Sequence, residues 1–255
     1  MHLPSLPGWS WFTLLLLGSL LPGFSSAAPA ATESNKSGLE LAAKLRSLAP
    51  PEQTEIRGWF NIQRHDQDTQ KIPLVMKVIL GPGYWETVYD TTATGGTPAE
   101  RLIIRHYPDK PNDYLWGQGG KSPAAVPREK LATRLAGSDF TFMDLGMEFW
   151  HWPGQLLLKP ERPAMKLGRT CDLLESSTGQ PIGGYSRVLS YIDKESGGII
   201  SAEAFAGTKR AAKSFTVKKF KKVEGRYELQ EMRMIDNKAD SRTWIDFDVE
   251  NGKGS

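Results

Sequence analysis

Several groups that carry chemistry in proteins are scarce in this sequence of 255 residues. Its single cysteine, Cys171, has no partner in the chain, so a framework of internal disulfides is excluded. Basic and acidic residues nearly balance at a formal net charge of +3, which gives no reason to expect nucleic-acid binding. Histidine is rare as well: apart from His2, only His65, His106 and His151 occur, and they lie in different strand-like segments.

Recognisable catalytic and metal-binding patterns are also missing. No two histidines have the spacing of zinc ligands on a helix, and no nucleophile is arranged with a base. The glycine-rich residues 117–122 have Leu115 where a phosphate loop has its first glycine, and Pro123 follows where a helix would begin. Asp139 and Asp144 would point in different directions on a short helix. We therefore expect no cofactor, no metal and no enzymatic activity, and a secreted hydrolase is only a third hypothesis.

The first thirty residues contain no Lys, Arg, Asp or Glu. Residues 9–21 form an apolar run, and residues 28–30 (Ala-Pro-Ala) offer the small side chains that a signal peptidase requires. This pattern predicts a cleaved signal peptide at 1–30 and a single exported domain at 31–255. No later segment is apolar enough to span a bilayer. An uncleaved anchor is the alternative, because no Lys or Arg precedes the apolar run.

Glycine (25 residues) and proline (17 residues) are abundant, which favours a β-rich fold with many turns over a helical bundle. Helical periodicity predicts a short amphipathic helix at 38–49, with Leu39, Ala42 and Leu45 on one stripe. Two short helices are expected at 128–136 and 140–145, the second capped by Ser138 or Asp139. Strands are predicted at 55–63, 73–80, 84–91, 101–107, 112–117, 147–152, 155–159, 167–176, 185–193, 199–206, 214–223, 227–235 and 242–249. This succession is typical of an open or closed antiparallel barrel with helices packed against it.

The predicted strand at 73–80 carries apolar side chains on both faces, with Leu74 and Met76 on one and Val75 and Ile79 on the other. One face of a barrel lines its interior, and an interior too wide for side chains to fill becomes a ligand cavity. Large aromatic side chains can line such a cavity or fill it as an ordinary core, and both interpretations stay open. The candidate lining residues are Trp59, Trp85, Tyr89, Trp116, Phe149 and Trp150.

Basic residues cluster between Lys209 and Arg226, where Glu224 is the single acid. Because lysines occupy both faces of the predicted strand at 214–223, we expect a solvated edge strand whose charges oppose aggregation. Docking of this hairpin to an anionic surface, such as lipid headgroups or an acidic protein, is the alternative.

Six segments have an order and spacing that cover most of the chain from residue 38 to residue 249. They are 137–145 (GSDFTFMDL), 167–171 (LGRTC), 185–188 (YSRV), 191–193 (YID), 227–234 (YELQEMRM) and 243–247 (TWIDF). In these segments the chain resembles the outer-membrane lipoprotein-sorting family, the relatives of the periplasmic carriers LolA and LolB. The resemblance implies a mainly β (α+β) fold: an unclosed antiparallel β-barrel of about eleven strands, with short helices across its mouth and a hydrophobic cavity. The helices at 128–145 are the candidate lid.

The same resemblance implies a non-catalytic periplasmic carrier, which binds the acyl chains of lipoproteins or similar amphiphiles and transfers them towards the outer membrane. An apolar interior suits that cargo, because each CH₂ group exposed to water costs about 0.8 kcal/mol. Its partners would be lipoprotein acyl chains or another lipid, an inner-membrane release complex and an outer-membrane acceptor. We expect a monomer that binds no nucleic acid. The alternative is an envelope sensor or protein-interaction module on the same barrel, with a filled cavity.

Overall fold

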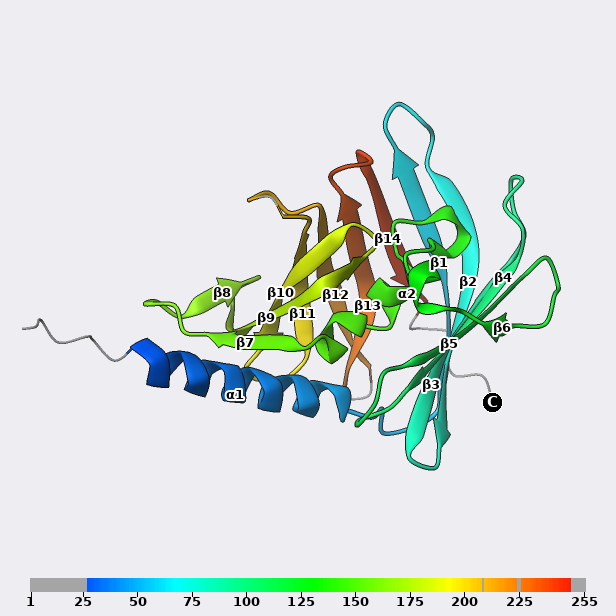
Figure 1. Cartoon of the computed structure of the whole chain (residues 1–255). Coiled ribbons are helices and arrows are strands. Elements are labelled where there is room, and N and C mark those ends of the chain that lie inside the picture. Colours follow the sequence, from blue (N-terminus) through cyan, green and yellow to red (C-terminus); the bar gives the residue numbers. More distant parts are fainter. Residues whose placement is uncertain (1–26, 208, 224–225, 249–255) are drawn as a thin grey trace, which may run out of the picture.

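The structure is a computed structural model that describes residues 27–207, 209–223 and 226–248. Within these residues, 14 strands form one antiparallel sheet in the order β6-β5-β4-β3-β2-β1-β14-β13-β12-β11-β10-β9-β7, and β8 pairs with β9. The sheet curves around the short helix α2 (Figure 1). Its two ends, β6 and β7, are not paired with each other, so the predicted unclosed antiparallel barrel is confirmed.

The N-terminal half of the sheet is a meander of antiparallel neighbours. It consists of β1 (Thr54–Arg64), β2 (Gln70–Gly81), β3 (Tyr84–Thr91), β4 (Glu100–His106), β5 (Asp113–Gln118) and β6 (Ala124–Ala125). Burial alternates clearly in β4, where Leu102 and Ile104 are buried and Arg101 and Arg105 are more exposed. This period of two places one face of the strand on the core and the other towards solvent.

The C-terminal half is also antiparallel, but here β7 pairs with β9 and β8 lies off the main order. It consists of β7 (Gly154–Leu158), β8 (Ala164–Lys166), β9 (Arg169–Ile182), β10 (Tyr185–Asp193), β11 (Ile199–Phe205), β12 (Lys213–Val223), β13 (Arg226–Asp236) and β14 (Ser241–Phe247). β14 pairs with β1 and so joins the two halves. Among the described residues the structure has 14 strands where about eleven were expected. Two of these 14, β6 and β8, have only two and three residues.

The helix α1 (Ala27–Arg46) lies along β7 (Figure 1) and begins and ends earlier than the predicted range of 38–49. Its buried residues Ala42 and Leu45 join a small core cluster, whereas Leu39 is 51% exposed and does not belong to the buried stripe. At Gly38 a Cβ atom would lie 2.5 Å from the main-chain oxygen of Gln155, so only glycine allows this close approach to β7. Residues 1–26 of the predicted signal peptide lie outside the described residues.

The connection between β6 and β7 differs from the predicted pattern. Instead of a helix at 128–136 it has two 3₁₀ turns, η1 (Arg128–Lys130) and η2 (Leu135–Gly137), because Ala136 and Gly137 adopt positive φ angles of 50° and 69°. The helix α2 (Phe142–Leu145) is capped by Thr141, not by Ser138 or Asp139. The predicted strand at 147–152 is wrong, since this segment forms the 3₁₀ helix η3 (Glu148–His151).

The edge strand expected in the basic cluster is correct for only part of β12. β12 lies inside the sheet, paired with β11 over residues 213–216 and with β13 over residues 213–223. Its inward residues Phe215 and Val217 are buried, while Lys218 and Lys219 are exposed beyond the stretch paired with β11. Beyond residue 216, β12 is therefore paired only with β13, and Lys218 and Lys219 lie where the strand is locally an edge.

One core joins the inner face of the sheet to the β6–β7 connection. Its largest fully buried side chains include Phe60 from β1 and Phe140 and Phe142 from the connection. The rings of Phe60 and Phe140 are 6.1 Å apart between centroids. Within the part of the chain that the structure describes, no helix combines the length and apolar character needed to cross a bilayer.

Candidate ligand-binding site

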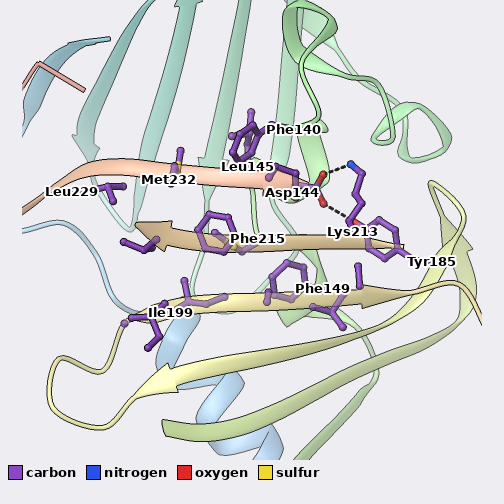
Figure 2. Close-up of a pocket in the computed structure, with 18 of the residues that line it drawn as sticks. Phe140, Asp144, Leu145, Phe149, Tyr185, Ile199, Lys213, Phe215, Leu229 and Met232 are labelled. Carbon is purple, nitrogen blue, oxygen red and sulfur yellow. Dashed lines mark hydrogen bonds and ion pairs between the residues drawn. The ribbon is translucent and has the colours of Figure 1, made fainter. Parts of the chain in front are cut away.

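A cavity of about 410 Å³ lies between the inner face of β10–β13 and the segment around α2 (Figure 2). Ligand pockets commonly measure roughly 300–1,000 Å³ and have mostly apolar walls. The wall of this cavity is mainly apolar as well. Its lining residues are Met76, Tyr89, Phe140, Asp144, Leu145, Met147, Phe149, Tyr185, Val188, Ser196, Gly198, Ile199, Ile200, Ala202, Ala204, Lys213, Phe215, Val217, Leu229, Met232 and Met234.

Two of the residues that line the cavity have small side chains. Ala202 and Ala204 of β11 line the cavity on the same strand face, because alternate residues of a strand share a face. Ala202 lies opposite Phe215 of β12, and the larger Phe215 packs beside the gap without filling it. Replacing either alanine by a larger residue would therefore reduce the volume directly.

A buried ion pair stands at one end of this otherwise apolar wall. Lys213 Nζ lies 2.8 Å from Asp144 Oδ2, and the two side chains are only 10% and 8% exposed. Lys213 also donates to the main-chain oxygen of Asp139 at 2.8 Å. The hydroxyl of Tyr185 donates to Asp144 Oδ1, and the hydroxyl of Thr141 donates to Oδ2 at 2.6 Å (Figure 2 shows the contacts of Lys213 and Tyr185). The cluster therefore satisfies its own charges and presents no net charge to the cavity.

The environment of Asp144 keeps it ionised. Burial alone would raise the pKa of this carboxyl, but the charge of Lys213 and hydrogen bonds from Lys213, Thr141 and Tyr185 together hold its pKa below the usual value. Burial and the neighbouring Asp144 raise the pKa of Tyr185 far above its ordinary value, so this phenol keeps the proton that it donates. Asp144 also closes the capping box at the start of α2, which fixes the helix to the cluster.

Asp139 is likewise structural and does not form an acid–base pair with Asp144. It accepts hydrogen bonds from Arg134 Nη1 at 2.6 Å, from Ser241 Oγ at 2.6 Å and from Thr243 Oγ1 at 2.8 Å. These contacts tie the β6–β7 connection to β14.

A second cavity of about 290 Å³ adjoins the first. Four residues line both cavities and form the wall between them: Met76, Tyr89, Leu145 and Met147. The other lining residues of the second cavity are Leu45, Arg46, Pro50, Val78, Trp85, Thr87, His106, Tyr107, Asn112, Gly146, Trp150 and His151. This set is more polar than that of the first cavity, and it includes residues of α1, β3, β4 and η3.

The residues that line the second cavity include Arg46 but no Asp or Glu that could compensate its positive charge. Burial and the neighbouring His151 lower the pKa of His106 to about 3, and burial and the charge of Arg46 lower the pKa of His151 to about 4, so both rings are neutral at pH 7. Arg46 Nη1 donates to the main-chain oxygen of Trp150 at 2.6 Å. Among the described residues, no carboxylate lies within ion-pair distance of Arg46.

The aromatic residues singled out in the sequence lie in three places. Tyr89 and Phe149 line the larger cavity, and Trp85, Tyr89 and Trp150 line the second one. Trp59 and Trp116 line neither of these two. Trp59 stands beneath Lys71, whose Nζ is 4.6 Å from the ring centroid, and Trp116 donates to Glu100 Oε2 at 2.9 Å.

The polar residues that distinguish the two cavities carry no local sequence signal. Lys213 and Asp144 are far apart in the chain and form no sequence motif, and Arg46 belongs to no motif either. Within the described residues, no group of three or more His, Cys, Asp or Glu side chains is placed to hold a metal ion, and Cys171 is a buried free thiol.

A family model described as "Uncharacterized protein" matches residues 101–250, more than half of the chain. The chain belongs to this family. No curated protein matches the sequence.

Three solved structures share the fold of this chain. A DUF1329 family protein from Desulfovibrio piger has a TM-score of 0.67 at 14% identity, over 87% of this chain and 95% of the other. A putative outer membrane lipoprotein-sorting protein domain from Vibrio parahaemolyticus has a TM-score of 0.68 at 15% identity, over the same shares. A LolA superfamily protein from Nitrosomonas europaea has a TM-score of 0.57 at 16% identity, over 84% and 91%. The predicted resemblance is thus confirmed for the fold.

Proposed function

We propose that this protein is a non-catalytic carrier that binds the acyl chains of lipoproteins, or similar amphiphiles, and transfers them towards the outer membrane. The observation that carries the proposal is the apolar cavity of about 410 Å³ inside an unclosed sheet. The proposal includes export through the signal peptide at 1–30, a periplasmic location and a monomeric carrier. Transfer would proceed from an inner-membrane release complex to an outer-membrane acceptor.

The chemistry of the wall supports an acyl ligand. Burying each CH₂ group is worth about 0.8 kcal/mol, so a chain gains stability in proportion to the length it buries. The ion pair of Asp144 and Lys213 neutralises itself and does not demand a charged ligand. Met76, Met147, Met232 and other unbranched side chains can adapt to chains of different shape. Tyr89 and Phe149 are the proposed ligand contacts among the aromatic residues predicted from sequence.

Loading requires a movement of the segment that covers the cavity. Phe140, Asp144 and Leu145 belong to the β6–β7 connection and line the cavity, so the proposed lid is residues 128–145. The contact of Lys213 with Asp144 and Asp139 joins this lid to β12. Opening the lid would have to break that contact.

The experiment combines mass spectrometry of organic extracts from the purified full chain with uptake of the neutral apolar dye N-phenyl-1-naphthylamine. We expect co-purified lipid and dye fluorescence that increases on binding. The variant Ala202→Leu fills part of the cavity and should weaken dye binding about tenfold or more. Ala239→Leu makes the same change at an exposed residue of the β13–β14 turn and should bind like the wild type.

Empty extracts together with no dye uptake would contradict the carrier. If such an empty protein retained one partner through a pull-down from envelope extracts, the envelope sensor would be the better description. Equal dye binding by wild type and Ala202→Leu would show that the dye binds elsewhere and would remove the cavity from the proposal.

A further inference from the structure

The two adjoining cavities differ in net charge. The charged groups of the larger cavity, Asp144 and Lys213, are paired with each other. The second cavity has Arg46 in its wall, and its two histidines are neutral at pH 7. A ligand that reaches both cavities therefore meets an apolar, neutral compartment and then a compartment with one positive charge.

Arg46 is held in place and still has donors to spare. Its Nη1 donates to Trp150 O at 2.6 Å and its Nε donates to Pro108 O at 3.4 Å. A guanidinium has five N–H donors on three nitrogens, and Nη2 has no partner among the described residues. Both partners are main-chain carbonyls, which orient the group without neutralising its charge. A planar cation of this kind suits the two oxygens of a carboxylate or phosphate.

A second donor in the same cavity also lacks an acceptor. The indole N–H of Trp150 is buried and has no hydrogen-bond partner among the described residues. Buried N–H groups are normally paired, and Trp150 lines the second cavity, so a shift of its indole ring would let this unpaired donor meet an oxygen of a ligand there. Arg46 and Trp150 are already neighbours through the hydrogen bond to Trp150 O.

The wall between the cavities is adaptable. Met76 and Met147 are two of its four residues, and methionine side chains change rotamer at little cost. A single flexible chain can cross such a wall once these side chains rotate.

We infer that the second cavity is a headgroup site for an anionic amphiphile, whose tail occupies the larger cavity and whose carboxylate or phosphate binds beside Arg46. This inference rests on the proposed function, since it names the class of amphiphile that the same site prefers. The two sources of such a headgroup are a free fatty acid and a phosphate-bearing lipid.

The test is displacement of N-phenyl-1-naphthylamine from the full chain at pH 7.4 by three ligands with 16-carbon chains: palmitate, hexadecyl phosphate and the neutral monopalmitoylglycerol. We expect at least one anionic ligand to displace the dye at a concentration about tenfold lower than the neutral one. Arg46→Gln should reduce this preference to less than about threefold and leave monopalmitoylglycerol unchanged. Arg46→Lys, which keeps the charge, should retain part of the preference. Lys44→Gln removes the same charge from an exposed position on α1 and should keep the wild-type preference.

If Arg46→Gln weakened dye displacement by palmitate alone, the headgroup would be that of a fatty acid. If it weakened displacement by hexadecyl phosphate alone, the headgroup would be a lipid phosphate. Equal displacement by neutral and anionic ligands in the wild type would overturn the headgroup site and leave the carrier intact. A preference that survives Arg46→Gln would also overturn it. Failure of the dye and all three ligands to bind would overturn the carrier and this inference together.

Discussion

The two cavities show two ways of placing charge next to apolar surface. Asp144 and Lys213 are almost fully buried, and each is paired with the other and with further hydrogen bonds. Arg46 has no ionic partner among the described residues, and it remains partly exposed at the wall of the second cavity. Burying an unpaired charge is costly, so the degree of exposure follows the availability of a counter-charge. Three predictions, at Lys213, His106 and Arg46, test this comparison.

The largest effect is expected from Lys213→Met, which leaves Asp144 buried without its cation. Removing one partner of a buried pair typically costs about 3–5 kcal/mol. We expect a loss of this size in the free energy of unfolding, measured by urea denaturation followed through tryptophan fluorescence. Lys218→Met, at an exposed position of the same strand, should change it by less than about 0.5 kcal/mol.

A double variant sharpens the result for the pair. Asp144→Asn with Lys213→Met removes both charges and should be more stable than Lys213→Met alone, because no uncompensated carboxylate remains. If the double variant lost the sum of both single effects, the two residues would act independently and the interpretation as a self-neutralising pair would be wrong.

The second prediction concerns the pH dependence contributed by His106. Its ring stacks on Trp85 at 3.7 Å between centroids, and its Nε2 lies 3.2 Å from Thr87 Oγ1. Burial and His151 lower its pKa to about 3, so its contribution to stability is fully present above the unfolded pKa of 6.5 and is lost as the pH falls towards 3. Between pH 6.5 and pH 4 this loss amounts to roughly 3 kcal/mol.

The measurement is urea unfolding of wild type and His106→Gln at several values between pH 7.5 and pH 4. The variant should show a shallower decline on acidification, and the double variant with His151→Gln a shallower one still, since the pKa of His151 is also lowered, to about 4. Parallel curves for wild type and His106→Gln would mean that His106 does not titrate as its burial requires.

The sheet was predictable because its signals are local. Alternation of the kind seen at Leu102 and Ile104 reports one buried face, and the turns are marked by glycine and proline. The errors lie where tertiary context overrides local preference. Residues 147–152 are aromatic and strand-like in composition, yet residues 148–151 form η3, preceded by Met147 in a left-handed conformation with φ of 49°.

The existence of an apolar site was predictable from the sequence, but its position and its polar residues were not. An apolar interior follows from strands with two apolar faces, but nothing in a single sequence indicates that Ala202 and Ala204 line the cavity. Lys213 belonged to a basic cluster that was interpreted as solvated. Its partner Asp144 lies 69 residues away, and only the folded chain brings the two together.

The smallest effect on stability is expected from Arg46→Gln. The substitution removes a cation that has no ionic partner, so only its hydrogen bonds to Trp150 O and Pro108 O are weakened, at about 1 kcal/mol in total. Urea unfolding without ligand should therefore show a much smaller loss than Lys213→Met, and Lys44→Gln should show almost none. A loss of 3 kcal/mol or more for Arg46→Gln would mean that Arg46 stabilises the fold as strongly as the buried pair does. Arg46 would then have a structural role like that of Asp144 and Lys213. Its position beside an apolar cavity would be explained by stability, and ligand binding would not be needed to explain it.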